Sequence, residues 1–219
     1  MKTAAKPFDF YTVAALTRVG NQVAGTLAEL HTGLQNCSDA SIFHHTFQTL
    51  GSHHFLTEGF SNDFAQWVLT STNRGDLAEQ LGSLDVRDYL SIAELRTDLS
   101  RIVGDYCAAH SSIIGQSALE PFWFCEGLEV NAPLDRSAST LDEFREGLEK
   151  LSHAAFYFHF ISSRMRLHLG TNDFSLWLAN ELELPALAER VNRIDIYTNT
   201  LDGARAVMLR LITREAGHA

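Results

Sequence analysis

The chain has 219 residues, of which 45% are apolar and 20% are charged, and its formal net charge is −10 at pH 7. This composition is typical of a globular protein and excludes a disordered chain. The acidic balance argues against a nucleic-acid backbone or an anionic membrane as the main partner, because both favour a basic surface. The length allows one or two domains.

The residues before Pro7 contain no apolar core of a secretory signal, and no uncharged apolar run approaches the ~18 residues that a membrane helix needs. The three cysteines, Cys37, Cys107 and Cys125, are widely spaced and form no C-x-x-C pair. They therefore indicate neither a disulfide framework nor a zinc ribbon. We expect a reduced, cytoplasmic protein without a membrane span.

Two segments of the chain match each other along most of their length. Residues 7–55 align with 121–169 without a gap, and 13 of the 49 pairs are identical. After a four-residue deletion the match resumes at Asn62 against Asn172. We interpret this pattern as a tandem duplication that forms one cooperative body. The predicted segments are a first helical unit at 7–104, a connector at 105–120 and a second helical unit at 121–213.

Each segment opens with an aromatic stretch, Phe8-Asp9-Phe10-Tyr11 in the first and Phe122-Trp123-Phe124-Cys125 in the second. The alternation of aromatic residues predicts a short strand or an extended arm against the core. Glycine and proline follow, at positions 20, 25, 127 and 133, and predict a loop.

The next stretch carries a helix start in both segments. Thr26 with Glu29, and Thr140 with Glu143, have the T-x-x-E spacing of a capping box. A second helix contains the histidines, a third begins at Asn-Asp, a short fourth follows, and a last helix is expected at 91–103 and at 200–212. We therefore predict a mainly α fold: two tandem homologous helical units packed about a pseudo-twofold axis, with short extended aromatic segments.

Histidines are frequent, with ten in the chain, and four of them cluster in the first segment. Neutral imidazole is a common ligand of transition metals such as zinc and iron. The predicted metal ligands are His44, His45, His53, His54, Glu58 and Asp63. Helix geometry weakens this hypothesis, because residues nine apart on an unbroken helix face opposite ways. The patterns Glu-x-x-His and His-Glu-x-x-His are both missing from the sequence.

His45 and His159 occupy matching positions in the two segments and lie off the predicted apolar stripe. They could meet a partner group, a loop carboxylate or each other, and they are our first choice for a cofactor-binding position, for example as axial ligand of a heme. Asp63 and Asp173 match in the same way. A general base is conceivable there, but we favour a structural role for the Asn-Asp pair at the start of a helix.

Several longer motifs recur in one known family. They are Phe43-His44-His45-Thr46, His53-His54-Phe55-Leu56, Asn62-Asp63-Phe64-Ala65-Gln66-Trp67, Phe158-His159-Phe160, Asn172-Asp173-Phe174-Ser175 and Asp195-Ile196-Tyr197-Thr198-Asn199. With these motifs the chain resembles the prokaryotic domain-of-unknown-function family numbered 5752, from about Phe8 to Ile212. The resemblance implies a tandem helical architecture, and it carries over no activity and no catalytic residue.

Signatures of enzymes are otherwise missing: the sequence has no G-x-G-x-x-G, no Walker loop and no G-x-S-x-G elbow. We therefore expect a non-catalytic protein that binds a protein partner, as a scaffold, adaptor or accessory subunit. The first alternative is a transition-metal protein or metal-dependent enzyme that uses the histidine cluster. The second alternative is a protein that binds heme or another apolar cofactor.

Overall fold

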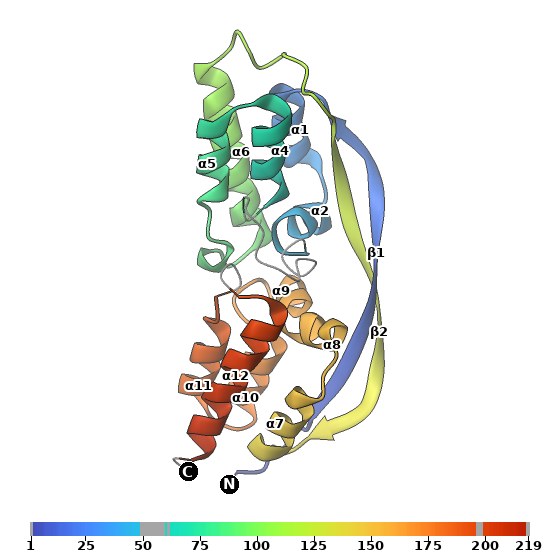
Figure 1. The fold of residues 1–219 in the computed structure, drawn as a ribbon, viewed down its shortest axis with the longest axis vertical. Coiled ribbons are helices and arrows are strands. Elements are labelled where there is room, and N and C mark those ends of the chain that lie inside the picture. Colours follow the sequence, from blue (N-terminus) through green and yellow to red (C-terminus); the bar gives the residue numbers. More distant parts are fainter. Residues whose placement is uncertain (1, 49–59, 61, 196–198, 218–219) are drawn as a thin grey trace. The chain divides into compact units, whose positions relative to one another are not determined.

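A computed structural model describes residues 2–48, 60, 62–195 and 199–217, and this part of the chain is 56% helix and 17% strand. Two long strands, β1 (Phe8–Ala24) and β2 (Phe122–Ala138), pair as an antiparallel two-stranded sheet (Figure 1). The fold is therefore mixed α and β. The prediction of a mainly α fold made of two tandem helical units about a pseudo-twofold axis is wrong.

The chain divides into two compact units, and each unit combines separate stretches of sequence. Apart from residues outside the described ranges, unit 1 holds Met1–Ala15 and Glu129–Ala219, and unit 2 holds Leu16–Ser52 and Thr57–Leu128. Each unit thus contains part of β1 and part of β2. The division at residues 7–104, 105–120 and 121–213 stays a prediction from the sequence.

Helices make up the rest of both units, and π-helical or 3₁₀ turns (η) interrupt them. Unit 2 contains α1 (Leu27–Asn36), α2 (Asp39–Phe43), η1 (His44–Gln48), α4 (Asp63–Thr72), α5 (Gly75–Gly82), η2 (Val86–Asp88) and α6 (Ile92–Ala109). Unit 1 contains α7 (Leu141–Glu149), α8 (His153–Tyr157), η3 (Phe158–Ser162), α9 (Ser163–Arg166), α10 (Asp173–Asn180), α11 (Pro185–Asn192) and α12 (Leu201–Ala216). None of the described helices is long and apolar enough to cross a bilayer.

The strands continue through residues that we expected to form loops. Gly20 lies inside β1, at a point where the paired strand comes very close. A Cβ atom there would lie 2.5 Å from the carbonyl oxygen of Phe124, so only glycine fits. Pro133 lies inside β2, which a two-stranded sheet tolerates because both strands are edges and half of their N–H groups need no partner strand. Pairing along the full length therefore outweighs these local signals.

The predicted helix starts are confirmed. The hydroxyl of Thr26 accepts a hydrogen bond from the backbone N–H of Glu29, and Thr140 does the same for Glu143. Each glutamate reaches back to the residue before the cap, since Glu29 accepts from the N–H of Gly25 at 2.7 Å. The last helices start at Ile92 and Leu201 and extend beyond the predicted ends, to Ala109 and Ala216.

The aromatic core of unit 1 brings β1 onto helices that follow more than a hundred residues later. The ring of Phe8 lies 5.3 Å from that of Phe144, 5.5 Å from that of Phe174 and 5.7 Å from that of Trp177. Phe10 covers Gly147 of α7, where a Cβ atom would lie 2.5 Å from the phenyl ring. The first aromatic segment thus packs on the helices of the second sequence segment.

Unit 2 repeats this arrangement with the roles of the strands reversed. The ring of Phe122, on β2, lies 5.2 Å from that of Phe64 and 5.8 Å from that of Trp67. Phe124 covers Gly33 of α1, where a Cβ atom would lie 2.2 Å from the ring. Burial of one such side chain contributes roughly 1.5–3 kcal/mol. The aromatic start of β1 thus belongs to the core of unit 1, and the aromatic start of β2 belongs to the core of unit 2.

Candidate functional site

Each unit contains a buried histidine that is paired with a partly exposed aspartate. In unit 1, Nδ1 of His159 lies 2.8 Å from Oδ2 of Asp173; in unit 2, Nδ1 of His45 lies 2.8 Å from Oδ2 of Asp63. His159 and His45 are only 2% and 4% exposed. Both histidines lie in π-helical turns, η3 and η1, which follow directly on short α-helices.

The aspartates are positioned by the starts of two helices. Asn62 is the N-cap residue of α4 and accepts from the N–H of Ala65, while Asn172 caps α10 through the N–H of Ser175. The residue that follows each asparagine is the aspartate of the pair. The helix N-terminus also favours a negative charge at that position. The expected capping role therefore belongs to the asparagines, and the aspartates orient the histidines.

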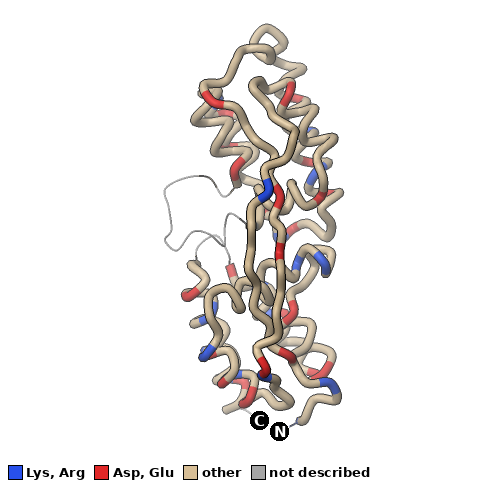
Figure 2. The backbone as a smooth tube through the Cα atoms, turned by 90° about the vertical axis from the view of Figure 1, so that its right-hand side faces the viewer, with Lys and Arg blue, Asp and Glu red and all other residues tan. Residues whose placement is uncertain are grey.

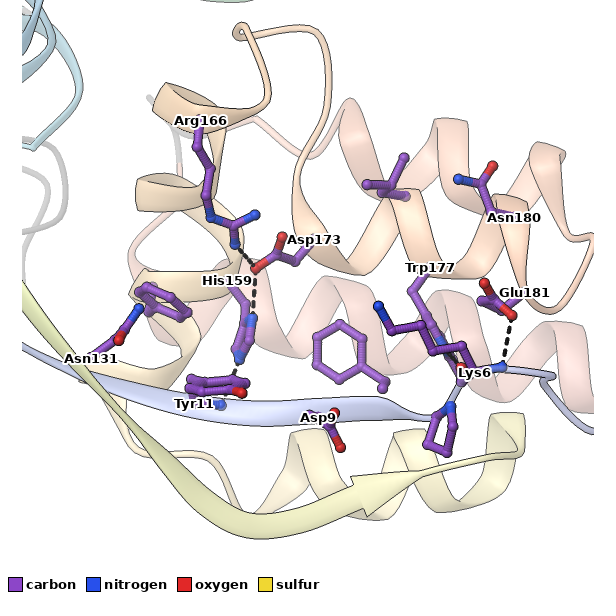
Figure 3. A pocket seen from close by; sticks show the side chains of 14 residues that line it. Lys6, Asp9, Tyr11, Asn131, His159, Arg166, Asp173, Trp177, Asn180 and Glu181 are labelled. Atoms are coloured by element: carbon purple, nitrogen blue, oxygen red, sulfur yellow. Dashed lines mark hydrogen bonds and ion pairs between the residues drawn. The ribbon is translucent and has the colours of Figure 1, made fainter.

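The second ring nitrogen of each histidine holds a strand. Nε2 of His159 accepts a hydrogen bond from the backbone N–H of Tyr11 on β1 at 2.9 Å, and Nε2 of His45 accepts from the N–H of Cys125 on β2 at 2.9 Å. Because Nε2 is the acceptor, the ring proton lies on Nδ1 and is donated to aspartate. Both nitrogens are thus engaged in joining a helix start to a strand, as Figure 3 shows for unit 1.

The pairs have little catalytic potential in this arrangement. A general base needs a free nitrogen within reach of a substrate proton, and an axial ligand needs a free lone pair. Nε2 of His45 and of His159 would each have to give up a backbone hydrogen bond first. A buried N–H without a partner costs about 1–3 kcal/mol. The geometry therefore favours a structural role for both histidines.

The predicted metal ligands fall into two groups. His53, His54 and Glu58 lie outside the described residues. His44 is half-buried, and its ring lies 4.9 Å from that of His45, which is bonded to Asp63. Within the described ranges, no group of three or more His, Cys, Asp or Glu side chains is placed to hold a metal ion. The metal site as a whole stays a prediction.

A pocket of about 420 Å³ lies beside the histidine pair of unit 1. Its aromatic lining consists of Phe8, Tyr11, Phe158 and Trp177. Its charged and amide lining consists of Lys6, Asp9, Asn131, His159, Arg166, Asp173, Asn180 and Glu181. Strand β1 forms one wall and η3 and α10 form the others, as Figure 3 shows. Its volume lies within the range of small-molecule sites.

Most acidic groups of this pocket are already engaged. Asp173 accepts from His159 and from the guanidinium of Arg166. Glu181 accepts from the backbone N–H of Lys6 at 2.9 Å, and the carbonyl of Lys6 accepts from the indole N–H of Trp177 at 2.9 Å. These bonds fix the start of β1 against α10.

The sequence analysis named His159 and considered Asp173 as a general base, but it did not select the other residues of this pocket. Lys6, Asn180 and Glu181 carry no motif, and they come from the residues before β1 and from the end of α10. The one available signal was Asp173, because it matches Asp63 as His159 matches His45. When two matching segments both keep a histidine at one position and an aspartate at another, the histidine and the aspartate are expected to be in contact.

The comparisons with known proteins agree with the resemblance noted above. The model of a family of unknown function, DUF5752, matches residues 5–213. The chain belongs to this family. The solved structure of OrfY from Thermoproteus tenax is similar, with a TM-score of 0.85, 27% sequence identity and coverage of 97% of each chain. No curated protein sequence matches the chain. Family membership therefore supports the fold and names no activity.

Proposed function

We propose that this DUF5752 protein is a non-catalytic binding protein, an adaptor or accessory subunit that recognises a protein partner through its strands in unit 2. The observation that carries the proposal is a set of exposed apolar side chains on β1 and β2. They are Leu16, Val19, Val23, Trp123 and Leu128, with exposed fractions of 68%, 56%, 37%, 49% and 43%. We call these five residues the ribbon surface.

Part of the ribbon surface points away from the helices of its own unit. Val19 and Val23 are exposed, whereas Ala24 is buried and Gly20 is half-buried. Because neighbouring side chains of a strand point to opposite faces, the two valines face outward. Trp123 is outward for the same reason, since it lies between the buried Phe122 and Phe124. Figure 2, which faces the strands, shows charged positions along them as well, and among these Arg18 and Glu126 pair with each other.

Exposed apolar patches on globular proteins mark interaction sites, and tryptophan is enriched at the centres of protein interfaces. The histidine pairs support the same proposal. Both ring nitrogens of His45 and of His159 are hydrogen-bonded within the chain, so these side chains serve the fold. The net charge of −10 favours a partner with a basic rim around an apolar centre. A protein partner therefore fits this surface better than a nucleic acid or an anionic membrane.

A photocrosslinking experiment in native cells tests the proposal. A benzoylphenylalanine residue at position 123 is expected to give one defined crosslinked product of higher mass. The same residue at position 105, where Asp105 is exposed on α6, is the matched control and is expected to give none. Val19→Lys together with Val23→Lys should suppress the product. Identical products at both positions, or a product at twice the mass of this chain, would contradict the adaptor proposal.

A further inference from the structure

Each strand of the sheet has one edge that faces no other strand, because the sheet consists of β1 and β2 alone. In unit 1 a histidine is bonded to β1 at its free edge, where Nε2 of His159 accepts from the N–H of Tyr11. In unit 2 a histidine is bonded to β2 in the same way, where Nε2 of His45 accepts from the N–H of Cys125. The edges that remain are that of β2 in unit 1 and that of β1 in unit 2.

These two remaining edges differ in their protection against a further strand. Proteins protect a free edge with proline, charged side chains or a local distortion, because an unprotected edge offers its N–H and C=O groups to another chain. The edge of β2 in unit 1 contains Pro133, which has no N–H, and Asp135, which is charged and has a φ of 47°. The sequence alignment places Val19 opposite Pro133 and Asn21 opposite Asp135. The edge of β1 in unit 2 therefore lacks the protection that its counterpart has.

This edge of β1 is open over residues 16–23. All of these residues are exposed or half-buried. Within the part of the chain that the structure describes, no side chain and no backbone group outside the sheet is bonded to their backbone. The one charged side chain among them, Arg18, pairs with Glu126 of β2. Val19 and Val23 are β-branched and favour the extended conformation. The stretch can therefore accept a third strand.

The negative charge of the chain is concentrated in unit 2. Residues 16–52 and 57–128 contain 13 carboxylates and 5 arginines, a net charge of −8, whereas the other residues contain 14 carboxylates and 12 Lys or Arg, a net charge of −2. A second copy of this chain would bring the same −8 to the edge, and repulsion disfavours that pairing. A basic segment of another protein is attracted instead.

One carboxylate lies at the end of this open edge. Glu120 is exposed and stands two residues before β2 begins. The N–H of Ala118 donates to the carbonyl of Gly25 at 2.7 Å, which places the residues before β2 beside the end of β1. Within the described ranges the carboxylate of Glu120 has no hydrogen bond or ion pair. It is therefore available to a cation of a bound segment.

We propose that the free edge of β1 in unit 2, residues 16–23, binds an extended segment of a basic partner protein as a third strand. Main-chain hydrogen bonds hold the segment. A sequence in which apolar residues alternate with Lys or Arg fits, because its apolar side chains then lie beside Val19 and Val23 and its cations meet the acidic surface of unit 2. This inference rests on the proposed function, since it names the kind of partner and its mode of binding.

Fluorescence anisotropy with a labelled peptide of five Lys-Val repeats tests the proposal on the full chain. The peptide is expected to bind with saturation below about 1 mM. The same peptide N-methylated at every residue is the matched control, because it keeps the side chains and the charge but cannot pair through its main chain. It should bind at least about tenfold more weakly. Amide hydrogen exchange at residues 16–23 should become slower with the first peptide and stay unchanged with the second.

Two substitutions at position 19 separate main-chain pairing from side-chain contact. Val19→Pro removes one N–H, and it should weaken binding of the unmethylated peptide about tenfold or more. A strand tolerates proline where its nitrogen faces a free edge, and β2 contains one at the matching position 133. Val19→Thr keeps the N–H and the β-branched side chain, so its affinity should stay within about threefold of that of the wild type.

Two peptide results would overturn the proposal. One is equal binding of both peptides by the wild type, because charge alone would then explain the binding. The other is no binding of the unmethylated peptide at about 1 mM. Both results come from the unaltered chain, so they are decisive even if Val19→Pro lowers the melting temperature.

The photocrosslink from position 123 distinguishes this proposal from the adaptor role. A product that forms in native cells with the same yield in the wild type and in Val19→Pro would reject strand addition and leave the adaptor role standing. The absence of any product in the wild type would reject the adaptor role itself. Loss of the product in Val19→Pro, with full yield in Val19→Thr, is the result that we expect.

Discussion

The carboxylate of Asp173 receives two donors, Nδ1 of His159 at 2.8 Å and the guanidinium of Arg166. Its counterpart Asp63 receives Nδ1 of His45 at the same distance. The side chain of Asp173 is 13% exposed and that of Asp63 is 37% exposed. The two units thus share one structural device, and in unit 1 an arginine covers it and contributes to a pocket.

Amide hydrogen exchange tests the role of the two histidines. His159→Ala should accelerate exchange at the N–H of Tyr11, because that N–H loses its acceptor, and His45→Ala should accelerate exchange at the N–H of Cys125. Each loss leaves a partly buried donor unpaired, so we expect a destabilisation of up to about 1–3 kcal/mol in addition to the packing loss. Each variant serves as the control of the other. Unchanged exchange at both amides would contradict the structural role.

The helix glycine Gly33 of α1 is expected to be intolerant of a methyl group. Gly33→Ala would place its Cβ atom 2.2 Å from the ring of Phe124, so the gain in helix propensity should be outweighed by overpacking of about 1–3 kcal/mol. Gly115→Ala, where no atom lies within 4 Å of the added carbon, is the control and should be close to neutral. Urea unfolding curves measure both effects.

The overpacking can be separated from an effect on the helix itself. Phe124→Leu shortens the side chain that faces Gly33, so the double variant should recover part of the stability that Gly33→Ala loses. Such coupling is expected only between residues in contact. Strictly additive losses in the two single variants would show that Gly33 and Phe124 do not share this contact.

The three thiols should react slowly at mildly alkaline pH. Burial raises the pKa of Cys37 and of Cys107, and burial together with the nearby Asp63 carboxylate raises the pKa of Cys125. The thiolate is the reactive form, so labelling by a disulfide reagent at about pH 8 should be much slower in the folded chain than in urea. Equal rates in the two conditions would contradict this expectation. Free cysteine is the reference for the reagent.

The stability of the fold should depend on Glu126 at acid pH. Hydrogen bonds from Ser38 and Arg18 lower the pKa of this carboxyl group, so its ionised form stabilises the folded state. The contribution is complete above the unfolded pKa of about 4.3 and is lost as the pH falls through the lower, folded value. The unfolding free energy of the wild type should therefore fall more steeply below about pH 4 than that of Glu126→Gln.

Urea unfolding at a series of pH values measures this difference. Glu94→Gln is a comparison at another carboxylate of unit 2 that also accepts a hydrogen bond, from the backbone N–H of Leu90. If the curves of the wild type and of Glu126→Gln run parallel down to about pH 3, Glu126 does not contribute to acid sensitivity.

Local signals determined much of what the sequence alone could predict. The capping residues Thr26, Thr140, Asn62 and Asn172 are where the pattern placed them, because an N-cap needs only a side-chain oxygen and a free amide within three residues. The two matching positions His45 and His159 make matching contacts, each with an aspartate and with a strand N–H. A capping motif joins residues that are three positions apart in the chain, so the sequence alone is enough to recognise it.

The tertiary structure alone decided which segments meet. The sequence shows that Phe8 and Phe10 are suited to a core, but it does not show that their core is formed by Phe144, Phe174 and Trp177. Full-length pairing of β1 with β2 overrides the turn signals at Gly20 and Pro133, because hydrogen bonds between distant strands leave no local pattern. The pocket has the same origin: Lys6, Arg166 and Glu181 are ordinary surface residues in the sequence, and only the docking of β1 on α10 brings them together.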